Sequence, residues 1–317
     1  MNDRYSPVKL SPAFKDYLWG GTKLKTVFQK ETDLDPVAES WELSAHRDGE
    51  STVASGSHVG KTLSRYLEEI GKEALGKKAE CFDYFPLLIK FIDAKSNLSV
   101  QVHPDDAYAL AVEGEYGKTE MWYVLDAEPD AFLYYGFKRD LTREEYEDAI
   151  RKGSLTDLLC RVSAKAGDVF FIPAGTVHAI GAGLLICEIQ QNSNTTYRVF
   201  DYNRRDKSGN TRPLHIEKAL EVSSLRRSPE RTPTPDGEDV LLATSEYFTV
   251  RRLRIKGTLS LHATPDSFIS LTVTAGKGNL QMEDSCLSLV AGDSIFIPAG
   301  ELPFTLTGEL EIIRSTL

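Results

Sequence analysis

A ten-residue segment that occurs twice constrains the fold of this chain more than any other feature. The segment AGDVFFIPAG at 166–175 returns as AGDSIFIPAG at 291–300, with eight of ten positions identical. In each copy the Gly-Asp pair is typical of a turn, the apolar residues of a strand, and Pro-Ala-Gly of the end of that strand. A unit that returns at this distance predicts two related β-barrels in one chain.

The remaining apolar segments predict a mainly β protein. They are short, rich in β-branched and aromatic residues, and separated by Gly, Pro, Asp or Asn, which is typical of strands in a barrel or sandwich. The most distinct segments lie at 85–94, 98–103, 120–127, 131–137, 168–175 and 183–190, and similar short segments follow residue 239.

Two stretches interrupt this pattern and favour helices. At 61–78 the apolar residues recur three and four positions apart, as on one face of a helix. The stretch 141–159 begins with a capping box, in which Thr142 is followed three positions later by Glu145. We expect both stretches to be helical insertions in the β framework.

A linker-like stretch predicts the domain boundary. Residues 226–239 combine charge and prolines with few apolar residues, which is typical of a linker. We therefore predict a first domain at 1–230, which contains both helical insertions, and a smaller degenerate β-domain at 231–317.

Composition excludes several classes of partner. The 317 residues carry 37 Lys and Arg against 47 Asp and Glu, a formal net charge of -10, which argues against binding to nucleic acid or anionic lipid. The four cysteines form no CxxC pair, so we expect reduced thiols. No signal peptide and no run approaching the ~20 apolar residues of a membrane span are present, and we expect a cytoplasmic protein.

One predicted strand has a wholly polar face. In LSVQVH, the alternation of side chains places Ser99, Gln101 and His103 on one face. Glu120 opens the next strand, and His178 follows the first copy of the repeat. Two imidazoles, a carboxylate and an amide oxygen suit a borderline divalent ion such as zinc, with one position left for water or substrate. For any one of these residues alone, a solvated sheet surface is the plainer interpretation.

The two copies of the repeat differ at the position that matters for this site. Three residues after the closing glycine, the first copy has His178 and the second has Pro303. We therefore expect only the first barrel to carry the metal site.

Several segments resemble the signature blocks of type I mannose-6-phosphate isomerases, which belong to the cupin superfamily. They are LSVQVHPDD (98–106), GKTEMWY (117–123), FIPAGTVHAIGAG (171–183), ICEIQQNSNTTYRVFDYNR (186–204), PAFKDYLWGG (12–21) and ESWELSAH (39–46). The resemblance implies two cupin-like jelly-roll barrels of the compact bacterial form. It also implies interconversion of mannose 6-phosphate and fructose 6-phosphate through an enediol.

The same resemblance implies roles for individual residues. It places one zinc ion per chain on four ligands, Gln101, His103, Glu120 and His178. Its catalytic candidates are Arg198, Glu188 and Lys118, and its substrate-binding candidates are Ser99, Lys118, Arg198 and Lys90. Arg198 is suited to an oxyanion, a phosphate or a structural ion pair. Glu188 is suited to proton transfer or to orienting a metal-bound histidine.

Two other functions fit part of the pattern. One is an Fe(II) or Mn(II) oxygenase, because His and carboxylate ligands alone select neither metal nor reaction. The other is a non-catalytic protein that binds sugar phosphates. Lys118 and Arg198 argue against the first, since an apolar substrate does not need them, and the intact ligand set argues against the second. We expect a monomer that acts on a small sugar phosphate.

Overall fold

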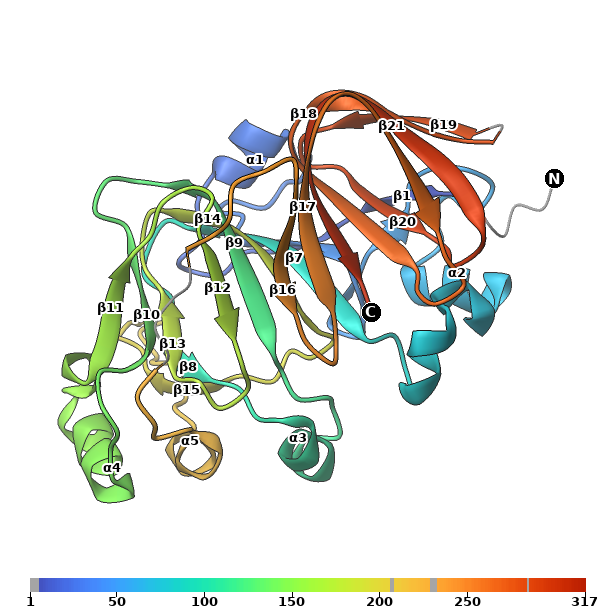
Figure 1. The fold of residues 1–317 in the computed structure, drawn as a ribbon. Coiled ribbons are helices and arrows are strands. Elements are labelled where there is room, and N and C mark those ends of the chain that lie inside the picture. The colour runs from blue at the N-terminus through green and yellow to red at the C-terminus, as the bar shows by residue number, and fades with distance from the viewer. Residues whose placement is uncertain (1–5, 206–207, 229–232, 284) are drawn as a thin grey trace.

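The computed structural model describes residues 6–205, 208–228, 233–283 and 285–317 and is mainly β, as the sequence predicts (Figure 1). The strands of these residues form three large antiparallel sheets and one small pair, β4 (Ala45–His46) with β5 (Gly49–Glu50). In the described part of the chain, no helix has the length and apolar character that crossing a bilayer requires.

Two of the sheets pack face to face. The six-stranded sheet has the order β12 (Val169–Ile172), β9 (Glu120–Ala127), β14 (Leu184–Gln191), β7 (Leu87–Ala94), β3 (Glu39–Leu43) and β2 (Ala13–Lys15). The five-stranded sheet has the order β11 (Leu159–Ser163), β10 (Phe132–Phe137), β13 (His178–Ile180), β8 (Val100–Val102) and β15 (Tyr197–Phe200). Buried side chains such as Trp122, Leu133 and Ile186 fill the space between them.

The central strands of the six-stranded sheet are covered on both faces. All eight residues of β14 are buried. Ile186 packs between the two sheets, whereas Cys187 and Ile189 belong to a second core shared with the C-terminal part of the chain. Because side chains alternate along a strand, Glu188 shares the inner face with Ile186. Its carboxylate is therefore placed inside the sandwich.

The third sheet has eight strands and its own apolar core. They are β16 (Asp239–Thr244), β17 (Thr249–Ala263), β21 (Leu302–Thr316), β18 (Ile269–Met282), β20 (Ser294–Ile297), β1 (Val8–Ser11) and β6 (Thr52–Val53), with β19 (Ser285–Val290) paired to β18. Figure 1 shows the blue strand β1 beside the orange and red strands. The strand pairing thus crosses the predicted boundary near residue 230, and that boundary and the two jelly-roll barrels stay predictions.

Both copies of the sequence repeat form the same turn. Gly167 and Gly292 have φ of 88° and 95°, a left-handed conformation that favours glycine. Asp168 accepts a hydrogen bond at 3.0 Å from the backbone N–H three residues earlier, and Asp293 accepts the equivalent bond at 2.8 Å. The strands that follow are β12 and β20, so the repeated sequence encodes a repeated structural unit.

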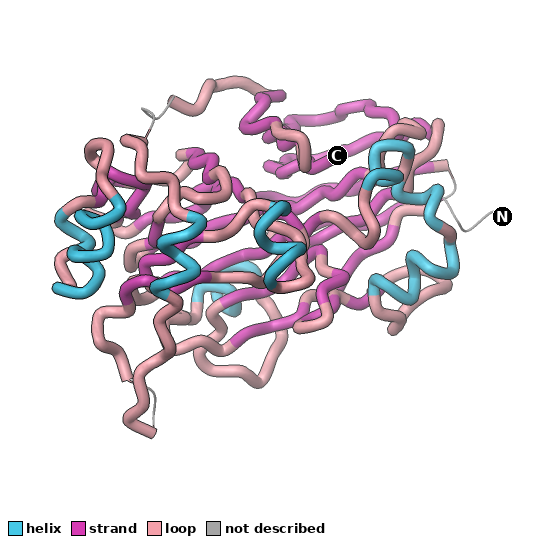
Figure 2. The backbone as a smooth tube through the Cα atoms, turned by 90° about the horizontal axis from the view of Figure 1, so that it is seen from below, coloured by secondary structure: helices cyan, strands magenta, loops and turns pink. Residues whose placement is uncertain are grey.

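Helices lie at the margins of the sheets. They are α1 (Lys23–Phe28), α2 (Leu63–Ile70), η2 (Lys72–Leu75), η3 (Lys77–Cys81), α3 (Asp106–Val112), α4 (Arg143–Lys152), η4 (Leu155–Asp157) and α5 (Ile216–Val222). The predicted capping box of Thr142 and Glu145 is present at the start of α4. Tyr146 of α4 and Leu220 of α5 pack with Val102 against the outer face of the five-stranded sheet. Figure 2 shows helices in a row across the strands.

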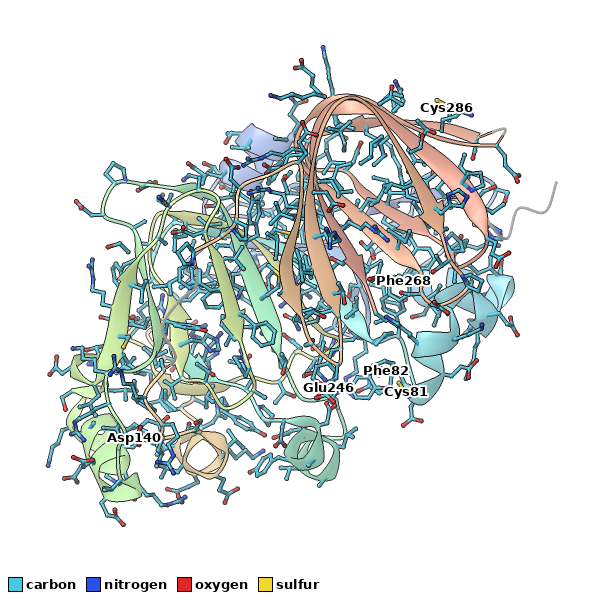
Figure 3. All side chains as sticks on the ribbon, in the orientation of Figure 1. Cys81, Phe82, Asp140, Glu246, Phe268 and Cys286 are labelled. Atoms are coloured by element: carbon cyan, nitrogen blue, oxygen red, sulfur yellow. The ribbon has the colours of Figure 1, made fainter. Side chains whose placement is uncertain are left out.

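All four cysteines are free in this structure. Cys187 is buried between the two halves of the molecule. Cys81 and Cys286 are exposed and lie in different parts of the fold (Figure 3).

Candidate metal centre and adjoining pocket

Three buried side chains converge at the ends of different strands. His103 directly follows β8, Glu120 begins β9, and His178 begins β13. Their nearest ligand atoms all lie within 4.8 Å of one another, and no other such group of His, Cys, Asp or Glu occurs in the described residues. His178 Nε2 is 3.2 Å from Glu120 Oε1, and His103 Nε2 is 3.7 Å from Glu120 Oε2. The structure therefore brings together three of the four ligands expected from the sequence.

Backbone carbonyls orient both imidazoles. His103 Nδ1 lies 2.9 Å from the carbonyl oxygen of Thr195, and His178 Nδ1 lies 2.9 Å from that of Thr176. Because a carbonyl oxygen only accepts, each Nδ1 carries the proton. The lone pair of each Nε2 is thereby directed to Glu120, which is the arrangement that metal-bound histidines adopt.

The polar atoms at the centre of this cluster are buried and short of partners. Within the described part of the chain, His103 Nε2 and Glu120 Oε1 have no hydrogen-bond partner, whereas Glu120 Oε2 faces the ammonium of Lys118 at 2.9 Å. A buried polar atom without a partner costs about 1–3 kcal/mol, so natural proteins rarely contain such atoms side by side unless an ion or water binds there. A divalent cation at the cluster would satisfy both.

The fourth expected ligand, Gln101, lies beside this cluster. In the five-stranded sheet Gln101 pairs directly with His178, and its amide nitrogen is 3.4 Å from His178 Nε2. Rotation of the amide by half a turn exchanges its nitrogen and oxygen with almost no change in shape. In the rotated form the oxygen is presented to the cluster.

Burial sets the protonation of the two histidines. It lowers the pKa of His178 to about 4 and the pKa of His103 well below its ordinary value. Both imidazoles are therefore neutral at neutral pH, the state in which they bind cations. Burial raises the pKa of Glu120, and the positive charge of Lys118 opposes that shift. A bound cation would favour the carboxylate form in the same way.

A second group of charges adjoins the cluster. Glu188 of β14 pairs with Lys90 of β7 across the sheet, and Lys90 Nζ lies 3.4 Å from Glu188 Oε1. Lys118 Nζ lies 2.9 Å from Glu120 Oε2 and 4.0 Å from Glu188 Oε1. Burial acts to raise the pKa of Glu188, but Lys118 and Lys90 outweigh it and lower that pKa. Glu188 is therefore an ionised carboxylate inside the protein.

A carboxylate that orients a metal-bound histidine accepts a hydrogen bond from the ring nitrogen that does not bind the metal. Glu188 does not do this, because the Nδ1 atoms of both histidines in the cluster donate to backbone carbonyl oxygens instead. Its Oε2 instead accepts a hydrogen bond of 2.8 Å from Trp122 Nε1, and its Oε1 faces the two lysines. Of the two roles that the sequence leaves open for Glu188, proton transfer therefore agrees better with these contacts than orienting a metal-bound histidine.

A polar cavity of about 240 Å³ lies next to the cluster. The expected site residues that line it are Lys90, Ser99, Gln101, Lys118, Glu188 and Arg198. Arg198 Nε donates to Ser99 Oγ at 3.3 Å, and Arg198 Nη1 donates to the backbone carbonyl of Pro213 at 3.0 Å. Residues scattered over more than a hundred sequence positions thus face one small space.

Sequence reasoning missed other residues of this cavity. Tyr17, Trp19 and Glu39 lie in the two N-terminal blocks that carry the resemblance, but no role was assigned to them. Glu39 Oε2 accepts a hydrogen bond of 2.6 Å from Trp41 Nε1 and lies 3.7 Å from Lys90 Nζ. Arg212 belongs to a loop with no motif of its own, and only its position in space reveals it.

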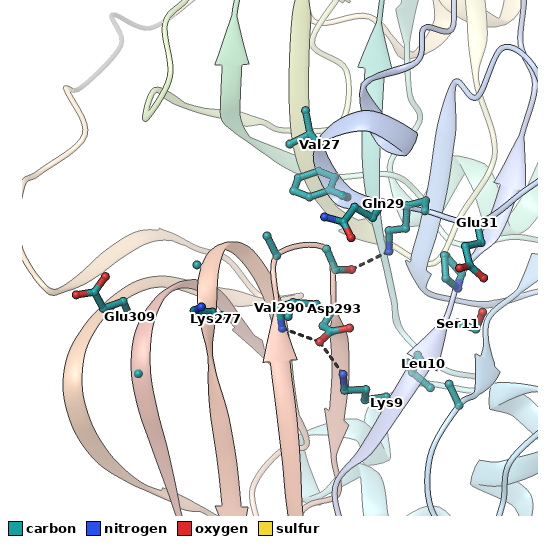
Figure 4. A pocket seen from close by; sticks show the side chains of 18 of the residues that line it. Lys9, Leu10, Ser11, Val27, Gln29, Glu31, Lys277, Val290, Asp293 and Glu309 are labelled. Carbon is teal, nitrogen blue, oxygen red and sulfur yellow. Dashed lines mark hydrogen bonds and ion pairs between the residues drawn. The ribbon is translucent and has the colours of Figure 1, made fainter.

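A larger cavity of about 1240 Å³ lies elsewhere, between α1 and the eight-stranded sheet (Figure 4). Two of its lysines already have partners. Lys9 Nζ lies 2.7 Å from Asp293 Oδ2, and Lys30 Nζ donates to the carbonyl oxygen of Gly292 at 2.7 Å. None of the expected site residues lines it, so cavity size alone does not locate the chemistry.

Comparison with known proteins agrees with this geometry. The family model of the phosphomannose isomerase type I catalytic domain matches residues 8–131, and that of the mannose-6-phosphate isomerase cupin domain matches residues 238–317. The mannose-6-phosphate isomerase ManA of Bacillus subtilis is 40% identical over 317 residues, which cover 98% of this chain and 99% of that protein. This chain belongs to the type I mannose-6-phosphate isomerase family. The resemblance stated from the sequence is therefore confirmed.

Other members of the type I mannose-6-phosphate isomerase family match over the whole chain. The mannose-6-phosphate isomerase of Streptococcus mutans is 38% identical over 313 residues, 98% of each protein. The crystal structure of the mannose 6-phosphate isomerase from Bacillus subtilis has a TM-score of 0.91 and 37% identity, and covers 98% of this chain and 100% of that one. A putative mannosephosphate isomerase from Archaeoglobus fulgidus has a TM-score of 0.79 and 26% identity, with 98% and 96% of the two chains covered.

Proposed function

We propose that this protein interconverts mannose 6-phosphate and fructose 6-phosphate with one zinc ion per chain, held by Gln101, His103, Glu120 and His178. The observation that supports this most is the buried group of His103, Glu120 and His178, in which His103 Nε2 and Glu120 Oε1 have no hydrogen-bond partner among the described residues, beside a small polar cavity. The activity named for the relatives in Bacillus subtilis and Streptococcus mutans supports the substrate.

The donor set fits zinc. Two imidazole nitrogens together with a carboxylate oxygen and an amide oxygen suit a borderline cation such as zinc, and the adjoining cavity leaves room for a substrate oxygen. When bound, a zinc ion supplies Lewis acidity that favours negative charge on an oxygen at the carbonyl end of the sugar.

Glu188 is our candidate for the proton-transfer group. Isomerisation requires that a proton leave C2 of the aldose and return to C1 of the enediol, while a hydroxyl proton moves between the two oxygens. A base for the carbon-bound proton must be ionised, buried and in contact with the substrate cavity. Glu188 meets these conditions, because Lys118 and Lys90 hold its pKa low and it lines the cavity.

Arg198 and Lys118 are our candidates for contact with developing negative charge. Arg198 makes no ion pair with any described acidic residue, and its guanidinium is steadied by Ser99 and by a backbone carbonyl. A fixed cation in a water-poor site stabilises an oxyanion more than solvent does. Lys118 lies between Glu120 and Glu188, so it also keeps the charges of the site balanced.

Two histidines and one carboxylate alone also suit an Fe(II) oxygenase. The lining of the cavity supports the isomerase. Arg198 and Arg212 line it, and guanidinium groups favour an anionic sugar phosphate over an apolar substrate. We further propose that the enzyme is a cytoplasmic monomer, as expected from its sequence.

Formation of fructose 6-phosphate from mannose 6-phosphate by the purified protein tests this proposal. Performed in deuterium oxide, the reaction should also place solvent deuterium at C1 of fructose 6-phosphate if the enediol exchanges its proton. The matched control is mannose, which lacks the phosphate. If zinc-loaded protein forms no fructose 6-phosphate, the proposed activity is wrong.

A further inference from the structure

The positive charges that line the small cavity are neutralised by carboxylates at one end of the cavity more completely than at the other. At its metal side, Lys90 and Lys118 face three carboxylates, those of Glu39, Glu120 and Glu188. The positive charge of these lysines is therefore neutralised within the protein. These two lysines therefore leave no surplus of positive charge for a phosphate group.

Around Asp201, by contrast, positive charges outnumber negative ones. Arg204 and Arg212 both pair with this single carboxylate, and the positive charges of Arg212 and Arg204 also lower the pKa of Arg198, after the larger effect of burial. Two guanidinium groups thus share one carboxylate, and Arg198 makes no ion pair with a described acidic residue. A phosphate group carries about −1.5 to −2 charges near neutral pH, which matches this surplus.

Contacts with strand β8 and with the residues just before it show in which order the metal cluster, Arg198 and the Asp201 group lie along the cavity. His103 and Gln101 mark the metal end. Arg198 contacts Ser99, two residues before Gln101, and Arg204 donates to the backbone carbonyl of Asn97, two residues further. Each step of two residues along an extended chain is about 6.6 Å. The Asp201 group therefore lies beyond Arg198 as seen from the metal end.

Asp201 holds the Arg212 side chain in place through two of its three guanidinium nitrogens. Its Nε donates to Asp201 Oδ2 at 2.8 Å and its Nη2 donates to Asp201 Oδ1 at 2.6 Å. No hydrogen bond from its Nη1 to a described residue occurs, and Arg212 lines the cavity. Arg204 shares the same carboxylate but does not line the cavity.

We propose that Arg212 binds the phosphate group of the sugar phosphate at the end of the cavity away from the metal cluster. This inference builds on the proposed function and gives that site its selectivity for phosphorylated sugars. Arg198 then lies between the phosphate and the metal end. A guanidinium whose other edge is fixed by a carboxylate is preorganised for phosphate oxygens.

The test is calorimetric titration of the metal-loaded protein with fructose 6-phosphate and, separately, with fructose. In Arg212→Ala we expect the dissociation constant for fructose 6-phosphate to rise about tenfold or more, since a hydrogen bond to a charged group is lost. The affinity for fructose and the metal content should stay unchanged. Arg212→Lys should recover part of the affinity, because it keeps the charge but loses the planar donor pair. In steady-state kinetics, Arg212→Ala should raise KM for mannose 6-phosphate far more than it lowers kcat.

Arg204→Ala is the matched control, because it removes an ion pair with the same carboxylate without removing a cavity cation. We expect it to weaken fructose 6-phosphate binding far less than Arg212→Ala does. Unchanged fructose 6-phosphate affinity in Arg212→Ala, or equal weakening in both variants, would overturn the proposal. So would an unmodified protein that binds fructose 6-phosphate no more tightly than fructose. Binding requires no turnover, so failure of the isomerase assay and failure of this inference are separate results.

Discussion

Replacing Lys90 with methionine should destabilise the protein strongly, because Lys90 is a buried cation between two carboxylates. It is 3% exposed, and its Nζ lies 3.4 Å from Glu188 Oε1 and 3.7 Å from Glu39 Oε2. Burial acts to lower the pKa of Lys90, but Glu39 and Glu188 outweigh it and raise that pKa. Lys90→Met keeps most of the side-chain volume and removes only the charge.

The size of the stability loss in Lys90→Met depends on the contacts that Glu39 and Glu188 keep after the lysine charge is removed. Removing one partner of a buried ion pair costs about 3–5 kcal/mol, because the other charge is left without compensation. Contact of the ammonium with the Trp41 ring, 4.9 Å from its centroid, is also lost. Trp122 and Trp41 still donate to Glu188 and Glu39, and Lys118 still faces Glu188 at 4.0 Å. We therefore expect a loss near the lower limit, about 3 kcal/mol.

The assay is urea unfolding of the zinc-loaded protein, with the free energy of unfolding extrapolated to zero denaturant. Lys95→Met is the matched control, since Lys95 is exposed near the end of the same strand and its replacement should change stability by no more than about 0.5 kcal/mol. The double variant Glu39→Gln with Lys90→Met should be more stable than Lys90→Met alone, because one unpaired carboxylate is removed. A loss below about 1 kcal/mol in Lys90→Met would refute the account of these charges.

Two further predictions separate the roles of the cavity residues. Arg198→Ala should keep its zinc but lose turnover about 100-fold or more, since a fixed donor to developing charge is removed. The measurements are kcat and zinc content of the variant. An active Arg198→Ala enzyme would show that Arg198 has no part in the mechanism. Glu188→Gln keeps the shape and the contact with Trp122 but cannot accept a proton, so kcat should fall about 100-fold or more with zinc retained. Substantial kcat in Glu188→Gln would show that another group moves the proton.

Local sequence patterns predict much of the site because short strands position its residues. The alternation in LSVQVH buries Val100 and Val102 against the outer helices and turns Ser99 and Gln101 to the cavity. The capping box at Thr142 and the repeated Gly-Asp turn are equally local, since all their hydrogen bonds lie within a few residues. Patterns of this kind are encoded in neighbouring residues and need no tertiary contact.

Other features depend on contacts between distant segments, which leave no local pattern. Strand β1 pairs with β20, almost three hundred residues later, and thereby joins the two ends of the chain in one sheet. Arg212 is placed in the cavity by its ion pair with Asp201, and Glu39 by its contact with Lys90. A charged residue is usually solvated, whether it lies in a loop like Arg212 or at the start of a strand like Glu39, so the sequence alone gives no reason to select either one.

Removal and return of zinc tests the central claim most directly. We would measure zinc content and formation of fructose 6-phosphate from mannose 6-phosphate before chelation, after chelation and after zinc is restored, with His178→Ala as reference. The account predicts one zinc per chain, loss of turnover with the metal and recovery when zinc returns, whereas His178→Ala should bind little zinc and remain inactive. Full turnover in the metal-free protein, or in His178→Ala, would contradict a metal-dependent isomerase centred on His103, Glu120 and His178.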